Sequence, residues 1–280
     1  MLLNSLRPYT IMGGLIASLL AVTAAAGVFI PGFYAPFITR PNLVAALYVQ
    51  DWVSLLAAPV LAAAIWWTGR GSRRALVIWC GVLVYTVYYY AFYVFGNVYN
   101  VFYPLYLALL GLGVYSLIGL LAGVNLPAFV AGVDAKMPVR TLAAILLVAL
   151  LFVPLWGSMI VQDIRAQQPR ATALVFVLDL CFLLPAITIA AVQVWRRRPL
   201  GYLLSGVLLI KAAVSGILLA VSTLWAVQLG YMALPVEEIG MYLFLTMAGS
   251  AGVVLYLRHL HGAVATKPAP PRSLVGSAAR

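Results

Sequence analysis

The stretch from 171 to 225 reads ATALVFVLDLCFLLPAITIAAVQVW, then RRRPLGY, then LLSGVLLIKAAVSGILLAVSTLW. Two apolar runs, each long enough to cross a bilayer, flank a turn that contains three arginines. Each run carries one ionisable residue, Asp179 in the first run and Lys211 in the second. A charge at membrane depth is costly unless it is paired or hydrated, so both residues are candidates for a functional site.

The composition of the whole chain agrees with a membrane protein. The 280 residues are 65% hydrophobic and only 8% charged, whereas soluble domains carry about 25% charged residues. The net charge of +11 does not indicate a nucleic-acid partner, because the basic residues lie in short loops between apolar runs. We therefore expect an integral membrane protein that is surrounded by the lipid bilayer and binds no nucleic acid.

Eight segments reach the roughly 20 apolar residues of a transmembrane helix. They lie at 10–31, 47–68, 75–96, 101–123, 140–161, 171–195, 201–226 and 233–257. Continuous apolar runs of this length are unlike the short alternating strands of a barrel. The sequence thus predicts an all-α polytopic transmembrane helix bundle, a single transmembrane domain over 1–262. The proline-containing segment 263–280 has no periodicity and is predicted to be a disordered cytoplasmic tail.

Lysine and arginine are distributed unevenly between the two sides of the predicted spans. With the N-terminus inside, 13 of the 17 lie on the inner side and 3 on the outer side, while Lys211 lies within the membrane. Positive residues gather on the cytoplasmic side, so both termini are predicted to be cytoplasmic in a cell membrane. The small residues at 23–27 leave open a cleaved signal peptide. The apolar run continues through Ile30 and favours an uncleaved first span.

The second and sixth spans share a sequence pattern. In each, an aspartate precedes a tryptophan by 16 positions, with a proline between them and an arginine-rich turn afterwards. The matching residues are Asp51, Pro59 and Trp67 in one span and Asp179, Pro185 and Trp195 in the other. This pattern predicts a 4+4 parallel internal repeat, in which a binding site would lie at the repeat interface. Chance similarity between apolar segments is the alternative interpretation.

The distances of the two intramembrane charges from the ends of their spans place them at similar depths in the membrane. Asp179 lies about 12 Å below the outer end of its span, and Lys211 lies about 15 Å above the inner end of the next. Consecutive spans joined by a short turn usually pack together. We therefore expect a direct or water-bridged Asp179–Lys211 pair. It could serve a substrate or proton pathway, or it could only fix the register of the helices; snorkelling of the lysine is a third interpretation.

The third span carries a ladder of tyrosines. Tyr85, Tyr89 and Tyr93 recur every four residues and share one helix face, and Asn97 and Asn100 close the ladder at the outer hairpin. Aromatic residues often form interfacial belts. Tyr85, however, lies near the middle of the membrane and requires a hydrogen-bond partner. The ladder favours a polar, aromatic-walled cavity open to the outside.

Further acidic residues lie in the outer third of the membrane. Asp51 is a few residues into the second span, and Glu237 and Glu238 follow Pro235 in the first turn of the eighth. The glutamates could line the mouth of the cavity, or they could simply complement the helix dipole. The predicted cavity is lined by spans two, three, six, seven and eight.

Motifs for cofactors and catalysis are not apparent. The sequence contains no phosphate-binding glycine loop, no zinc-ligand spacing and no nucleophile beside a base. His259 and His261 are two residues apart and diverge on a helix, which argues against a metal or haem site. No cofactor and no metal are predicted, and whether the chain is an enzyme stays open.

The segment 70–117, RGSRRALVIWCGVLVYTVYYYAFYVFGNVYNVFYPLYLALLGLGVYSL, resembles a family of uncharacterised bacterial multi-pass membrane proteins. The resemblance is carried by an aromatic YAFYxFG segment followed by an asparagine-containing hairpin. It implies a bacterial cell membrane and no particular activity.

These features favour transport or binding of a small molecule or ion. Asp179 and Lys211 would form the charge pair, with Asp51, Tyr85 and Tyr89 lining the cavity. A non-catalytic subunit or scaffold of a larger complex is the first alternative, and a membrane enzyme acting on a lipid or quinone is the second. The sequence leaves open a homo-oligomer or a partner membrane subunit.

Overall fold

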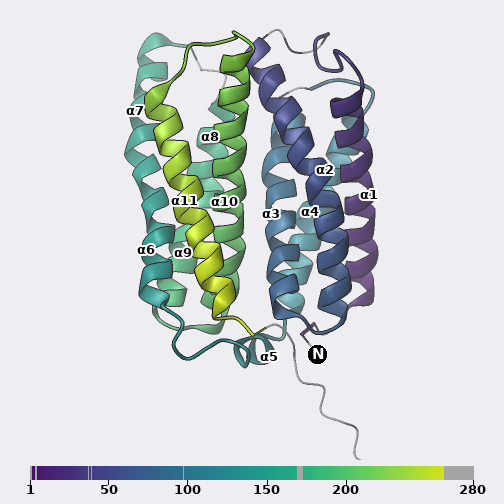
Figure 1. Cartoon of the computed structure of the whole chain (residues 1–280), viewed down its shortest axis with the longest axis vertical. Helices are drawn as coiled ribbons and strands as arrows, with labels where there is room; N and C mark the ends of the chain where they lie inside the picture. The colour runs from purple at the N-terminus through teal and green to yellow at the C-terminus, as the bar shows by residue number, and fades with distance from the viewer. Residues whose placement is uncertain are drawn as a thin grey trace, which may run out of the picture.

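The computed structural model describes residues 2–3, 5–36, 38, 40–96, 98–168 and 173–261. These residues form a helix bundle without strands, as Figure 1 shows, which confirms the predicted all-α fold. Within the described ranges, eight helical segments are long and apolar enough to cross a membrane, in agreement with the eight predicted spans. The predicted tail at 263–280 lies outside the described residues.

The first four spans are uninterrupted helices. They are α1 (Arg7–Phe29), α2 (Pro41–Gly69), α3 (Arg73–Phe95) and α4 (Tyr103–Gly123). Gly71 takes a φ of 86° in the turn between α2 and α3, a conformation that favours glycine. Ser72 then caps α3, because its hydroxyl accepts a hydrogen bond from the backbone N–H of Ala75 at 3.3 Å. This tight turn makes α2 and α3 antiparallel neighbours.

Spans five and six each contain a change in helical winding. Span five consists of α6 (Val139–Leu147), the 3₁₀ turn η1 (Val148–Leu151) and α7 (Phe152–Ala166). Span six consists of α8 (Ala173–Val177), the π-helical turn η2 (Leu178–Leu183) and α9 (Leu184–Trp195). Pro185 has no N–H to donate, and the N–H of Leu184 bonds to the carbonyl of Asp179, five residues back. Such π turns are frequent at functional sites, and this one contains Asp179.

The last two spans are α10 (Pro199–Gln228) and α11 (Val236–Arg258). A short helix, α5 (Leu126–Val130), lies beneath the bundle in Figure 1. We call this end, with the turns at 70–74 and 196–198, the arginine end. Arg73 donates to the carbonyl of Ala128 in α5 at 3.0 and 3.1 Å, and Arg74 donates to the carbonyl of Leu260 at 2.7 Å. Arg73 and Arg74 thus connect the start of α3 to α5 and to the residues after α11.

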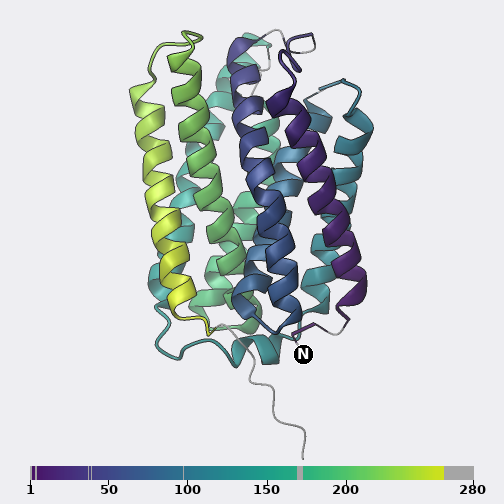
Figure 2. The ribbon, with the colours of Figure 1, turned by 45° about the vertical axis from the view of Figure 1, so that its right-hand side comes forward.

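The spans pack as two groups that stand side by side in Figure 1. In the first half, α1 packs on α2, α2 on α3, α3 on α4 and α4 on α1. In the second half, α6 packs on α9, α9 on α10, α10 on α11 and α11 on α6. The halves meet mainly where α10 packs on α2 and α3. In the turned view of Figure 2, α10 again lies beside α2. The predicted 4+4 repeat requires such a common packing order and stays a prediction.

Candidate functional site

Lys211 lies near the middle of α10, where the two halves meet. It is 12 residues after Pro199, which corresponds to about 18 Å along the helix. The residue is only 5% exposed, and its Nζ lies 3.6 Å from the ring centroid of Tyr88 and 5.9 Å from that of Tyr89. A cation over an aromatic face is attracted by the π electrons. Two rings on α3 therefore hold an ammonium group that comes from the other half.

Asp179 contacts the hydroxyl of the same tyrosine. The Tyr88 hydroxyl donates to Asp179 Oδ1 at 2.8 Å, and the indole N–H of Trp156 donates to Oδ2 at 3.0 Å. Within the described part of the chain, Asp179 and Lys211 form no direct ion pair. Tyr88 instead connects them, with its ring toward Lys211 and its hydroxyl toward Asp179. The two charges are linked through a tyrosine.

The N–H donors of the Lys211 ammonium are not used in hydrogen bonds to the described residues. The ammonium carries three N–H donors, yet none of the described residues accepts a hydrogen bond from it. Ser215, one turn further along α10, is 9% exposed and lies beside Tyr89. Buried polar groups are normally hydrogen-bonded. This face of α10 thus offers unused donors. We call Lys211, together with Tyr88, Tyr89, Asp179 and Ser215, the Lys211 site.

Tyr85 supports the wall of the Lys211 site. Tyr85, Tyr89 and Leu218 form a small hydrophobic cluster between α3 and α10, and the centroids of the two tyrosine rings lie 4.9 Å apart. The Tyr85 hydroxyl shares a hydrogen bond of 2.7 Å with Ser54 and donates to the carbonyl of Gln50 at 3.1 Å. Because these partners lie on α2, the hydroxyl is used within the first half.

Asp51 belongs to a separate network inside the first half. It is 1% exposed and accepts hydrogen bonds from the hydroxyls of Tyr34 at 2.5 Å and Tyr93 at 2.7 Å. Gly27 on α1 lies so close to the Asp51 carboxylate and the Tyr34 hydroxyl that a Cβ there would collide with both. Burial, together with the nearby charge of Asp51, raises the pKa of Tyr34 above its ordinary value, which keeps Tyr34 a donor. Asp51 thus links α2 to α3 and to the loop after α1, while Gly27 of α1 packs against its carboxylate.

Asn100 has a local role in the turn before α4. Its side-chain amide donates to the Tyr106 hydroxyl at 3.1 Å, and its Oδ1 accepts a hydrogen bond from the backbone N–H of Phe102 at 2.9 Å. These contacts shape the hairpin between α3 and α4 and do not reach Lys211. Asn97, the other predicted residue of this hairpin, lies outside the described residues.

The two glutamates are exposed in the first turn of α11. Glu237 and Glu238 make no contact with Lys211 or Asp179 in the part of the chain that the structure describes. Acidic residues in a first turn complement the helix dipole. Both interpretations of the sequence place the glutamates in this turn, and a role at the mouth of a cavity stays a prediction.

Sequence reasoning passed over three residues that the structure places in these networks. Tyr88 is three positions from Tyr85 and could have been grouped with the tyrosine ladder by its helical spacing. Trp156 lies in the fifth span, and Tyr34 lies in the loop after the first. Neither has a charged residue close in sequence that pairs with it, so only the packing of the helices brings them to Asp179 and Asp51.

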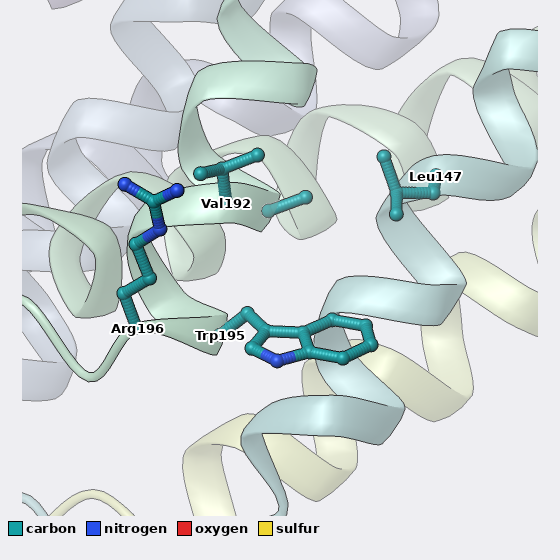
Figure 3. A pocket seen from close by; sticks show the side chains of 5 residues that line it. Leu147, Val192, Trp195 and Arg196 are labelled. Carbon is teal, nitrogen blue, oxygen red and sulfur yellow. The ribbon is translucent and has the colours of Figure 1, made fainter.

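A surface pocket lies at the arginine end of the bundle, away from the predicted cavity. It has a volume of about 230 Å³ and is lined by Leu147, Ala191, Val192, Trp195 and Arg196. Figure 3 shows the Trp195 indole reaching from its helix toward the one that carries Leu147. The pocket therefore opens between α6 and α9.

Over the described residues, no three His, Cys, Asp or Glu side chains come together as a metal site. Cys80 is buried, Cys181 is exposed, and both are free thiols. Comparisons of the chain with protein-family models, with curated proteins and with solved structures gave no match. The functional inference therefore depends on the geometry of the Lys211 site.

Proposed function

We propose that the protein is a membrane carrier for a small organic anion, which binds at the Lys211 site. One observation carries this proposal: a buried ammonium at the interface between the halves has no hydrogen-bond acceptor among the described residues. A carboxylate ligand would supply the missing acceptor and a compensating charge. Its apolar part would lie against the rings of Tyr88 and Tyr89.

Asp179 provides the counter-charge when the site is empty. It interacts with Lys211 through Tyr88, and its own oxygens are satisfied by Tyr88 and Trp156. An arriving anion can therefore bind the Lys211 ammonium while both carboxylate oxygens of Asp179 keep their hydrogen bonds. Removing one partner of a buried ion pair is expensive, so this separation of the two charges makes exchange less costly.

The position of the site supports transport rather than binding alone. The helix α10 has 30 residues, about 45 Å, so Lys211 lies near mid-depth. Transporters built from parallel repeats bind their substrates near mid-depth, at the repeat interface, and rock one repeat against the other. Movement of α10 against α3 would open the Lys211 site to one side at a time. In this proposal the arginine end faces the cytoplasm of a bacterial cell.

Uptake into liposomes tests the proposal. The purified protein is reconstituted, and the uptake of radiolabelled acetate, lactate and benzoate is measured beside that of the cation choline. We expect uptake of at least one carboxylate and none of choline, and we expect Lys211→Met to lower the carboxylate uptake at least tenfold. Lys136→Met is the matched control, because Lys136 is exposed in the segment before α6 and should keep the parent rate.

Two results would contradict the carrier. One is carboxylate uptake no faster than into empty liposomes, with folding of the parent verified by circular dichroism. The other is a Lys211→Met variant that transports as the parent does. The double variant Asp179→Asn, Lys211→Met should be no more active than Lys211→Met alone, since the anion has then lost its ammonium.

A further inference from the structure

We propose that the pocket between α6 and α9 is a binding site for an anionic phospholipid, with an acyl chain in the pocket and the phosphate on Arg196. The pocket lies at the arginine end and shares no residue with the Lys211 site. The proposal is therefore independent of the carrier function.

The lining of the pocket suits hydrocarbon. Leu147, Ala191, Val192 and Trp195 supply most of it, and in Figure 3 Val192 and Leu147 flank the opening beside the Trp195 indole. The volume of about 230 Å³ is below the roughly 300–1,000 Å³ of pockets that enclose whole small molecules. A pocket of this size and character accommodates part of an acyl chain.

The pocket faces the lipid at the level of the headgroups. Val192 is exposed and Trp195 is 53% exposed, although both lie on a helix that spans the membrane. Trp195 is the last residue of α9, and tryptophans concentrate at the boundary between hydrocarbon and headgroups. A lipid molecule can therefore enter the pocket from the side.

Charge complementarity selects a phosphate-bearing headgroup. Arg196 lines the pocket, and in Figure 3 its guanidinium lies beside Val192. This guanidinium makes no hydrogen bond or ion pair within the described residues, whereas that of Arg197 donates to the Ala135 carbonyl at 3.2 Å. Arginine binds phosphate oxygens through two parallel N–H groups. Basic pockets between spans on the cytoplasmic side bind anionic lipid headgroups. Arg198, two residues after Arg196, adds positive charge.

An arginine at the end of α2 provides a matched control. The Arg70 guanidinium lies 4.4 Å from the centroid of the Trp66 ring, so it is already occupied by a cation–π contact. Arg70 follows α2 as Arg196 follows α9. Both variants, Arg70→Gln and Arg196→Gln, remove one positive charge from the arginine end, but only the second removes it from the pocket.

Native mass spectrometry tests the lipid site. The full chain is solubilised with equal amounts of phosphatidylglycerol and phosphatidylcholine, and the retained lipid is counted. We expect the parent to retain phosphatidylglycerol at least fivefold over phosphatidylcholine. Arg196→Gln should lower this retention at least fivefold, and Arg70→Gln should leave it unchanged. Val192→Trp fills the pocket at an exposed position, so it should also lower retention while the arginines stay in place.

Three outcomes would overturn the proposal. Equal retention of the two lipids would show that charge does not select the occupant. Unchanged retention in both Arg196→Gln and Val192→Trp would place the bound lipid elsewhere. Displacement of phosphatidylglycerol by excess inorganic phosphate, together with unchanged retention in Val192→Trp, would show that the site recognises phosphate and holds no acyl chain.

Discussion

Asp51 and Asp179 occupy matching positions in the predicted repeat, and their surroundings are chemically alike. Each carboxylate accepts two hydrogen bonds from aromatic side chains: Asp51 from Tyr34 and Tyr93, Asp179 from Tyr88 and Trp156. The difference lies in where the donors come from. Both donors of Asp51 belong to the first half, whereas Asp179 in the second half binds a tyrosine of the first.

In the proposed carrier, Asp51 has a structural role and Asp179 has a role in transport. The Asp51 network joins α2, α3 and the loop after α1, and Gly27 leaves just enough room for it. The Asp179 network crosses the interface between the halves and continues through Tyr88 to Lys211. A hydrogen bond that crosses a moving interface must break and re-form, while one inside a rigid half need not. We therefore expect substitutions at Asp51 to affect stability and substitutions around Asp179 to affect transport.

The largest effect is expected from a substitution on α1 that disrupts the Asp51 network. Gly27→Val places side-chain carbons where the Asp51 carboxylate and the Tyr34 hydroxyl lie. We expect a loss of about 3 kcal/mol in the free energy of unfolding, because overpacking adds to the loss of buried hydrogen bonds. Thermal unfolding followed by circular dichroism in detergent measures the loss.

Gly14→Val is the control on the same helix. A Cβ at Gly14 would meet nothing within 4 Å, so its stability should change by no more than about 0.5 kcal/mol. Equal melting temperatures for the two valine variants would mean that the Asp51 network does not require the space at Gly27.

A smaller effect is expected when each aspartate becomes asparagine. In Asp51→Asn, one buried tyrosine hydroxyl faces an NH₂ group, which cannot accept its hydrogen bond, and we expect a loss of about 1–3 kcal/mol in stability. The uptake rate per folded molecule should stay at the parent level. Asp179→Asn should instead lower carboxylate uptake at least fivefold. The distinction between the two aspartates fails if Asp51→Asn reduces uptake as strongly as Asp179→Asn does.

Most of the fold follows from hydropathy. Length and apolar composition sufficed to predict all eight spans, and the structure shifts some of their ends, such as α2 beginning at Pro41 rather than 47. The π turn at Leu178–Leu183 was not predicted. Pro185 was noted in the sequence, but a proline can kink a helix or be accommodated by several local changes. The winding around Asp179 therefore depends on packing.

The candidate site was only partly predictable, for a reason common to membrane helices. Lys211 and Asp179 were found because charges are rare within apolar spans. The helices are apolar on nearly all faces, so the sequence does not reveal which face meets which neighbour. This is why Tyr88 was passed over in favour of Tyr85 and Tyr89, and why Asp51 was assigned to the same cavity as Asp179.

Two tyrosines on α3 distinguish the Asp179 network from the Asp51 network most directly. Tyr88→Phe and Tyr93→Phe each remove one hydroxyl that donates to a buried aspartate, Asp179 in the first case and Asp51 in the second. Both rings remain, and each variant should lose only about 1–2 kcal/mol of stability. Carboxylate uptake per folded molecule is then measured in the same liposome assay. We expect Tyr88→Phe to transport about fivefold more slowly than Tyr93→Phe, which should keep the parent rate. Equal rates, or a slower Tyr93→Phe, would contradict this expectation.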